Sequence, residues 1–211
     1  MKYDIFGPQK AGAKRTLNAF ILALFTILAR KSFEEITIQE ICAEAEYPRA
    51  TFYNYFDDKY DLLNYLWYRT TSEIRLEEYA SLPSDRILPV YFTRLYTLLE
   101  SLEENIRLLL RHNSGDGYLM SSVKIYFDSQ IRSIVENVTV SSYGDIPRDL
   151  IVSHFSQTMY LLFEWRFVRQ NPCSVGQAYL YLMSLLKNLP PESCDPLPED
   201  LISCETVTLR F

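Results

Sequence analysis

Two signals that start helices, separated by a short run, constrain the fold of this chain more than any other feature of its sequence. Thr37 and Glu40 have the spacing of a capping box, in which each side chain accepts a hydrogen bond from the backbone N–H of the other residue. Pro48 prevents the helix that begins at Thr37 from continuing, and it is suited to the first turn of a second helix. The stretch predicts a helix from Thr37 to near Ala45, a turn of about three residues, and a second short helix.

The second short helix falls in the stretch TFYNYFDDKYDLL, residues 51 to 63, which is rich in aromatic side chains. Phe52 and Phe56 stand at positions i and i+4 and share one face of a helix, so we expect both rings to point into a core. The remaining positions point elsewhere and include Arg49, Ala50, Tyr53 and Asn54, with Tyr55 at the border.

Lys59 stands at the start of a further helix, where a cation is unfavourable against the helix dipole unless an anion lies nearby. A phosphate of a nucleic acid is one such anion. The neighbouring carboxylates of Asp57, Asp58 and Asp61 are the other. The sequence leaves both interpretations open.

The composition of the 211 residues is that of a globular protein, because 48% are hydrophobic and 23% are charged. The net charge of −6 excludes a protein that coats nucleic acid through bulk positive charge, so any DNA binding has to be local. The four cysteines form no C-x-x-C pair, which disfavours a structural zinc site or a disulfide framework. We expect reduced thiols, a cytoplasmic location, and neither metal nor cofactor.

One apolar stretch, LNAFILALFTILA at residues 17 to 29, has the composition of a signal-peptide core. Arg30 and Lys31 follow it at once in place of a cleavage site, and it is too short to span a membrane. Its apolar residues recur at helical spacing, at Leu17, Phe20, Ile21, Leu24, Phe25 and Leu28. We therefore expect a core helix from about Gln9 to Lys31, and no membrane association.

The chain from Lys59 to about Leu189 has helical patterns throughout, and no strand alternation competes with them. The expected helices run over about 59–79, 85–102, 104–112, 118–137, 148–170 and 174–189. The prediction is an all-α protein with a three-helix helix-turn-helix domain over 1–58, a helical domain over 59–189 and an extended C-terminal tail over 190–211.

The run ITIQEICAEAEYPRATFYNYFDDKYDLL, with the helix before it, resembles the DNA-binding domain of the TetR family of bacterial transcriptional regulators. The resemblance covers about residues 10 to 63, and T-F-Y-x-x-F-x-x-K-x-x-L-L is its most specific part. It implies a homodimeric regulator, in most such proteins a repressor, that binds a double-stranded DNA operator. It also implies that the domain over 59–189 serves dimerisation and binds a small-molecule effector that controls the DNA affinity.

The resemblance carries roles over to particular positions. It places Thr37 and Gln39 at the start of the helix that crosses the phosphate backbone. The helix inserted in the major groove would carry Arg49, Ala50, Thr51, Asn54 and Tyr55, and phosphate contacts would come from Tyr53 and Lys59. Lys10, Lys14 and Arg15 lie where the family's first helix approaches the DNA backbone.

The sequence departs from the family pattern at two positions of the turn. Glu46 stands where the family usually has glycine, and Pro48 stands where it often has a serine or threonine cap. If Glu46 adopts a left-handed backbone, the cost is on the order of 1 kcal/mol. Residues 1 to 62 also hold eight Lys and Arg against nine Asp and Glu, so this domain is not basic overall. The departures in the turn and the lack of net positive charge both lower the expected affinity for DNA.

The helices from 148 onward suggest how the chain assembles, and the middle helices are where a ligand pocket is expected. The last two are apolar on all sides, which predicts a homodimer interface with Phe155, Met159, Leu162, Tyr179, Leu182, Met183 and Leu186. A pocket for an apolar or aromatic ligand would be lined by Trp67, Tyr91, Tyr96, Phe127, Phe155 and Trp165, although all six can equally be ordinary core residues.

Two other classes of protein compete with a DNA-binding regulator. An enzyme is disfavoured because the chain has no G-x-S-x-G or P-loop motif, and Met120 replaces the last glycine expected of a dinucleotide loop in GDGYLM. His112 and His154 have no convincing partner at metal-ligand spacing. The other alternative is an adaptor that keeps the helical fold, docks another protein and has weak or no operator binding.

Overall fold

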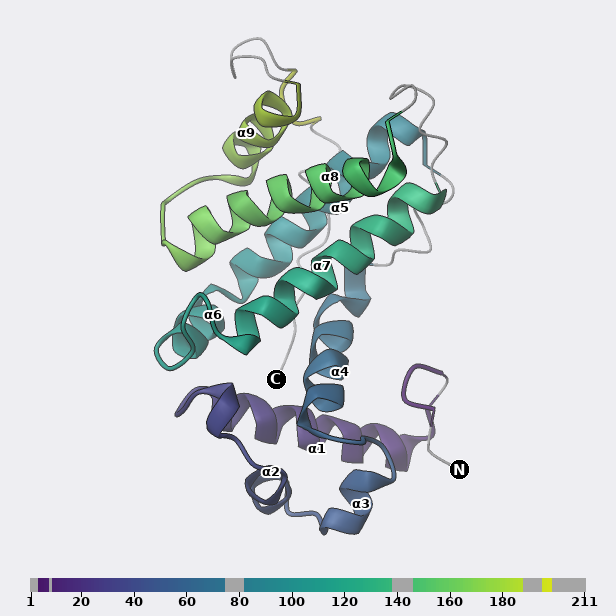
Figure 1. The fold of residues 1–211 in the computed structure, drawn as a ribbon, viewed down its shortest axis with the longest axis vertical. Helices are drawn as coiled ribbons and strands as arrows, with labels where there is room; N and C mark the ends of the chain where they lie inside the picture. Colours follow the sequence, from purple (N-terminus) through teal and green to yellow (C-terminus); the bar gives the residue numbers. More distant parts are fainter. Residues whose placement is uncertain (1–3, 8, 75–81, 138–145, 188–194, 199–211) are drawn as a thin grey trace. The chain divides into compact units, whose positions relative to one another are not determined.

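The structure is a computed structural model that describes residues 4–7, 9–74, 82–137, 146–187 and 195–198 (Figure 1). Every regular element in these residues is a helix, which confirms the predicted all-α class. The N-terminal elements are α1 Ala11–Leu28, η1 Phe33–Glu35, α2 Ile38–Glu44, α3 Arg49–Tyr53, α4 Lys59–Thr71 and η2 Ser72–Ile74. They are followed by α5 Ser84–Ser101, α6 Glu103–Leu110, α7 Tyr118–Asn137, α8 Arg148–Phe163, the π-helical turn η5 Glu164–Val168 and α9 Val175–Lys187.

The described chain divides into two compact units. The first unit holds the chain up to Thr70 together with Leu108–Ser122, and the second holds Thr71–Arg107 and the described residues from Val123 onward. The functional division predicted at residue 58 remains a prediction. The predicted tail, 190 to 211, lies outside the described residues except for 195–198, which have no regular structure.

The core of the first unit forms around α1. Five of the six apolar positions expected on this helix are buried, and only Phe25 is partly exposed. By length and composition α1 is the one described helix that could cross a membrane, but half of it is buried inside the protein. Side chains from η1, α2, α3 and α4 pack on it in one continuous cluster that includes Phe33, Ile41, Phe52 and Leu62. This pattern is that of a core helix.

Asn113 joins the segment Leu108–Ser122 to the rest of the first unit. Its side chain is only 4% exposed, and its Oδ1 accepts a hydrogen bond of 2.9 Å from the backbone N–H of Phe33. Its Nδ2 donates to the carbonyls of Leu28 and Leu109 at 3.3 and 2.9 Å. A buried amide keeps its place only when its polar atoms have partners, so these bonds fix where η1 begins.

Glu34 and Tyr118 provide a second attachment within the same unit. The Glu34 carboxylate accepts a hydrogen bond of 2.8 Å from the backbone N–H of Tyr118, the first residue of α7, and this bond lowers the pKa of Glu34. The ring of Tyr118 stacks on Phe33 with centroids 5.4 Å apart. Consequently η1 is held by two residues that lie far along the chain, Asn113 and Tyr118.

The second unit contains α5, α8, α9 and most of α7. Phe163 is its central ring, because it stacks on Phe92 of α5 and on Phe127 of α7 with centroids 5.5 and 5.8 Å apart. The next turn of the chain continues this packing, since Phe167 contacts Tyr96 at 5.3 Å between centroids. Buried aromatic contacts thus continue from the end of α8 into η5.

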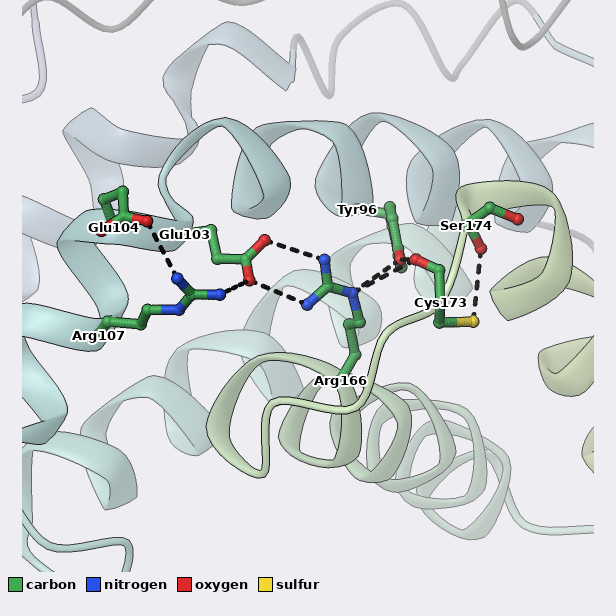
Figure 2. A network of polar contacts seen from close by, with 7 residues as sticks. All are labelled: Tyr96, Glu103, Glu104, Arg107, Arg166, Cys173 and Ser174. Carbon is green, nitrogen blue, oxygen red and sulfur yellow. Dashed lines mark hydrogen bonds and ion pairs between the residues drawn. The ribbon is translucent and has the colours of Figure 1, made fainter.

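Arg166, in the π-helical turn after α8, is the centre of a polar network (Figure 2). Its guanidinium makes hydrogen bonds of 2.9 and 3.3 Å to the two carboxylate oxygens of Glu103, and its Nε donates to the Tyr96 hydroxyl at 3.2 Å. The Tyr96 hydroxyl in turn donates to the backbone carbonyl of Cys173. The bond to Arg166 lowers the pKa of Glu103, so their pairing stabilises the charged form of both groups.

We predict that Arg166→Leu lowers the free energy of unfolding by about 1.5 to 3 kcal/mol, because it removes the buried charged donor of Glu103 and of the Tyr96 hydroxyl, while Glu103 keeps its ion pair with Arg107 at 2.7 Å. The matched control is Arg169→Leu in the same region. Arg169 pairs with Glu164 at 2.8 Å, but its side chain is 63% exposed against 10% for Arg166, so the loss should stay below about 1 kcal/mol. Urea denaturation measures both variants, and equal losses would contradict this account.

Candidate nucleic-acid interface

The capping box that opens α2 is present as predicted. Thr37 Oγ1 accepts from the Glu40 backbone N–H at 3.3 Å, and the Glu40 carboxylate accepts from the Thr37 backbone N–H at 2.9 Å. Lys31 adds a hydrogen bond of 2.6 Å to Glu40, and this contact is the main reason why the pKa of Glu40 is lowered to about 2. The start of α2 is therefore fixed by local contacts.

The turn between α2 and α3 is built around Glu46. Its backbone is left-handed, with φ of 57°. The backbone N–H of Tyr47 donates to the Cys42 carbonyl at 3.0 Å, and that of Glu46 donates to the Ala43 carbonyl at 3.2 Å, which together form a Schellman motif. Pro48 is the residue immediately before α3, one position earlier than a first-turn proline.

Phe52 lies on the inner face of α3, and Phe56 lies three residues beyond the end of this helix, which is shorter than the run of residues to Phe56 predicted from the sequence. Phe52 and Phe56 have no exposed surface, which confirms that they are core residues. Both contact Phe20 of α1 edge to face, with centroids 5.4 and 6.2 Å apart. Because the two rings fix the rotation of α3 about its axis, they also determine which residues face outward.

The outer face of α2 and α3 gathers most of the residues that the family resemblance assigns to DNA. Arg49, Ala50, Tyr53 and Asn54 are exposed, and Thr37 and Gln39 are exposed on α2, whereas Thr51 and Tyr55 are partly buried. The guanidinium of Arg49 donates to the Gln39 side-chain oxygen at 3.1 Å, so the two helices are linked at this face. Lys10, Lys14 and Arg15 are also exposed, at the start of α1.

Lys59 has partners that neither interpretation of the sequence considered. Its ammonium donates to the backbone carbonyls of Phe33, Glu34 and Ile36, each at 2.9 Å. The neighbouring aspartates have other partners: Asp58 caps α4 by accepting from the Tyr60 and Asp61 backbone N–H groups, and Asp61 accepts from the backbone N–H of Asp57. No local sequence pattern indicates carbonyls more than twenty residues away as partners.

The predicted ligand-lining residues do not share one location. Trp67 belongs to the first unit, where its indole N–H donates to Ser122 at 3.0 Å, and the other five belong to the second unit. Tyr91, Tyr96 and Phe127 are buried there, whereas Phe155 and Trp165 are partly exposed. The ligand pocket stays a prediction.

The predicted dimer residues divide into two groups. Those covered within their own chain are Met159, Leu162, Tyr179 and Leu182, and those partly exposed are Phe155, Met183 and Leu186. The large apolar side chains that α8 and α9 do expose are Leu150, Leu161 and Leu185. Leu150 and Leu161 line an open groove on the outer face of α8 together with polar groups such as His154, Gln157 and Lys124 of α7.

Comparison with known protein families agrees with this geometry. Residues 21–66 match the family model for bacterial regulatory proteins, tetR family, which represents the family's N-terminal DNA-binding domain. The match contains α2, α3 and the start of α4, including the exposed face described above. A search of curated proteins finds no match to the chain.

We predict that Glu46→Gly raises the free energy of unfolding by about 1 kcal/mol, because glycine adopts the left-handed backbone without a Cβ penalty. The control is Ala43→Gly, three residues earlier on the exposed side of α2, which should lower the free energy of unfolding by a similar amount. Thermal and urea unfolding measure both. A destabilised Glu46→Gly variant would show that the glutamate makes a contact worth more than the strain.

Proposed function

We propose that this chain is a transcriptional regulator of the TetR family, which binds a palindromic DNA operator as a homodimer and represses transcription until a small apolar or aromatic ligand releases it. The observation that carries the proposal is the orientation of α3. Phe52 on its inner face and Phe56 just after its end are buried in the core, while Arg49, Tyr53 and the C-cap residue Asn54 stand on the exposed side. A helix presented in this way is suited to insertion in the major groove.

The exposed side chains divide by chemistry into those that read bases and those that contact phosphates. Arg49 offers a guanidinium to guanine, and Asn54 offers an amide to adenine. Tyr53 is half exposed and offers a hydroxyl to a phosphate oxygen. Thr37, Gln39, Ala50, Thr51 and Tyr55 complete the proposed surface. This binding is local, as the net charge of −6 requires.

The outer face of α8 supports the homodimer. Leu150 and Leu161 are 62% and 51% exposed and line one groove, and Leu185 of α9 is 49% exposed. Apolar side chains gathered on a helix face favour burial against a partner. We propose that a second copy covers this face, with the partly exposed Phe155, Met183 and Leu186 at its edges.

The ligand-binding role is proposed for the second unit, with Tyr91, Tyr96, Phe127, Phe155 and Trp165 as candidate lining residues, and with Trp67 of the first unit as the remaining candidate. The chain then acts as a binding protein in the bacterial cytoplasm and not as an enzyme. A thermal-shift screen of apolar and aromatic compounds tests this role, because a bound ligand raises the melting temperature by mass action.

An adaptor without operator binding is the alternative function. The observation that favours it is Glu46, which is exposed in the turn beside α3 and adds a negative charge where DNA would lie. A DNA-shift assay at stoichiometric concentrations separates the two functions. A regulator retards the fragments that it selects from genomic DNA, and an adaptor retards none.

On DNA selected in this way, we predict that Arg49→Ala costs roughly 1 to 3 kcal/mol of binding free energy and relaxes the base preference at one position of each half-site. Tyr53→Phe should weaken binding about equally on all sequences, because a phosphate contact carries no base information. Fluorescence anisotropy with a panel of single-base operator variants measures both effects. Unchanged affinity in both variants would favour the adaptor.

We predict that Leu161→Glu converts the dimer into a monomer at micromolar concentration, because burial of the new carboxylate in an apolar interface is strongly unfavourable. The control is Leu22→Glu, which changes a leucine of α1 that is 42% exposed and lies in the first unit. Multi-angle light scattering measures the mass of each. A monomeric wild-type protein would rule out the homodimer.

A further inference from the structure

We propose that Lys59 is a positioning residue, which holds the segment before α2 against the start of α4, and that it is not a phosphate contact. This inference rests on the proposed operator binding, because the segment that Lys59 holds leads directly into the DNA-facing helices. It departs from the role that the family resemblance implies for this lysine.

The hydrogen-bonding capacity of the ammonium is the first argument. A lysine side chain has three N–H donors, and here each can be assigned to one backbone carbonyl, those of Phe33, Glu34 and Ile36, all at 2.9 Å. A phosphate oxygen would have to replace one of these acceptors. The carbonyl it displaced would lose its charged donor, so the attachment of all three carbonyls to Lys59 would be broken.

The surroundings of the ammonium are the second argument. It lies 4.8 Å from the centroid of the Phe33 ring and 5.6 Å from that of Tyr60, so aromatic faces add cation–π attraction. Burial lowers the pKa of Lys59, which is the effect of an environment that withdraws the group from water. These contacts together fix the ammonium within the first unit.

The location of the three carbonyls shows what this contact positions. Phe33 and Glu34 belong to η1, and Ile36 directly precedes Thr37, the residue that caps α2. The start of η1 is also held by Asn113, which accepts from the Phe33 backbone N–H. With Lys59 in place, the start of α2 is connected to the start of α4, and α3 lies between them in the chain.

The test combines hydrogen exchange without DNA and operator affinity as a function of salt, in wild type, Lys59→Met, Lys59→Arg and Tyr53→Phe. Methionine keeps an unbranched chain against the rings but removes the charge and all three donors. Arginine keeps the charge, but its planar fork does not match three carbonyls that converge on one nitrogen. Tyr53→Phe is the control for loss of a phosphate contact in a residue outside η1.

The proposal predicts that Lys59→Met and Lys59→Arg both accelerate amide exchange at Glu40 and Ile41 about tenfold, since these N–H groups are bonded to Thr37 at the start of α2. Both variants should bind the operator more weakly at every salt concentration. The slope of log affinity against log salt should stay at the wild-type value. Tyr53→Phe should leave the exchange rates unchanged.

If Lys59 instead contacts a DNA phosphate, the experiments give different results, and these would overturn the proposal. Lys59→Met would then reduce the salt slope by about 1.8, one phosphate in each half-site, with unchanged exchange in α2. Lys59→Arg would keep the wild-type slope and affinity. If the wild type selects no DNA at all, the proposed function fails, and the exchange rates still decide whether Lys59 holds the segment before α2.

Discussion

The packing of Phe52 and Phe56 against Phe20 is the interaction on which the rest of the first unit depends. A helix of five residues has no stability of its own, because the cost of forming its first turn is not repaid over so short a length. The two rings of this region have no exposed surface, and truncation of such a ring costs about 3 to 5 kcal/mol. They therefore supply both the stability of α3 and its orientation, which leaves its outer side free for a different function.

The elements next to α3 are held in place by further contacts, some between neighbouring residues and others between residues far apart in the chain. The capping box and the Schellman motif are local and fix the two ends of α2. Lys59 connects α4 to η1, and Asn113 connects η1 to the segment after α6. The exposed face of α2 and α3 is thus held by several contacts within the first unit, as the proposed local recognition of DNA by an acidic protein requires. Electrostatic attraction over the whole molecule contributes little to such binding.

Sequence patterns predicted the features that depend on neighbouring residues and missed the contacts that join residues far apart in the chain. The capping box and the inward Phe52 and Phe56 follow from residues a few positions apart, and both are confirmed. The left-handed backbone of Glu46 was indicated only by the glycine that the family has at this position. The partners of Lys59 and the pairing of Arg166 with Glu103 join distant residues, so no spacing rule could indicate them. The sequence also could not predict which face of α8 is buried within its own chain, because this helix has apolar residues on all sides.

The central claim is that the outer face of α3 lies in the major groove, and methylation interference tests it most directly. Guanine N7 lies in the major groove, so a methyl group there blocks an arginine that approaches the base. We expect methylation of one guanine in each half-site to prevent binding by the wild type, and the same methyl group to have no effect on Arg49→Ala. The claim is contradicted if N7 methylation at every guanine of a bound fragment leaves wild-type affinity unchanged.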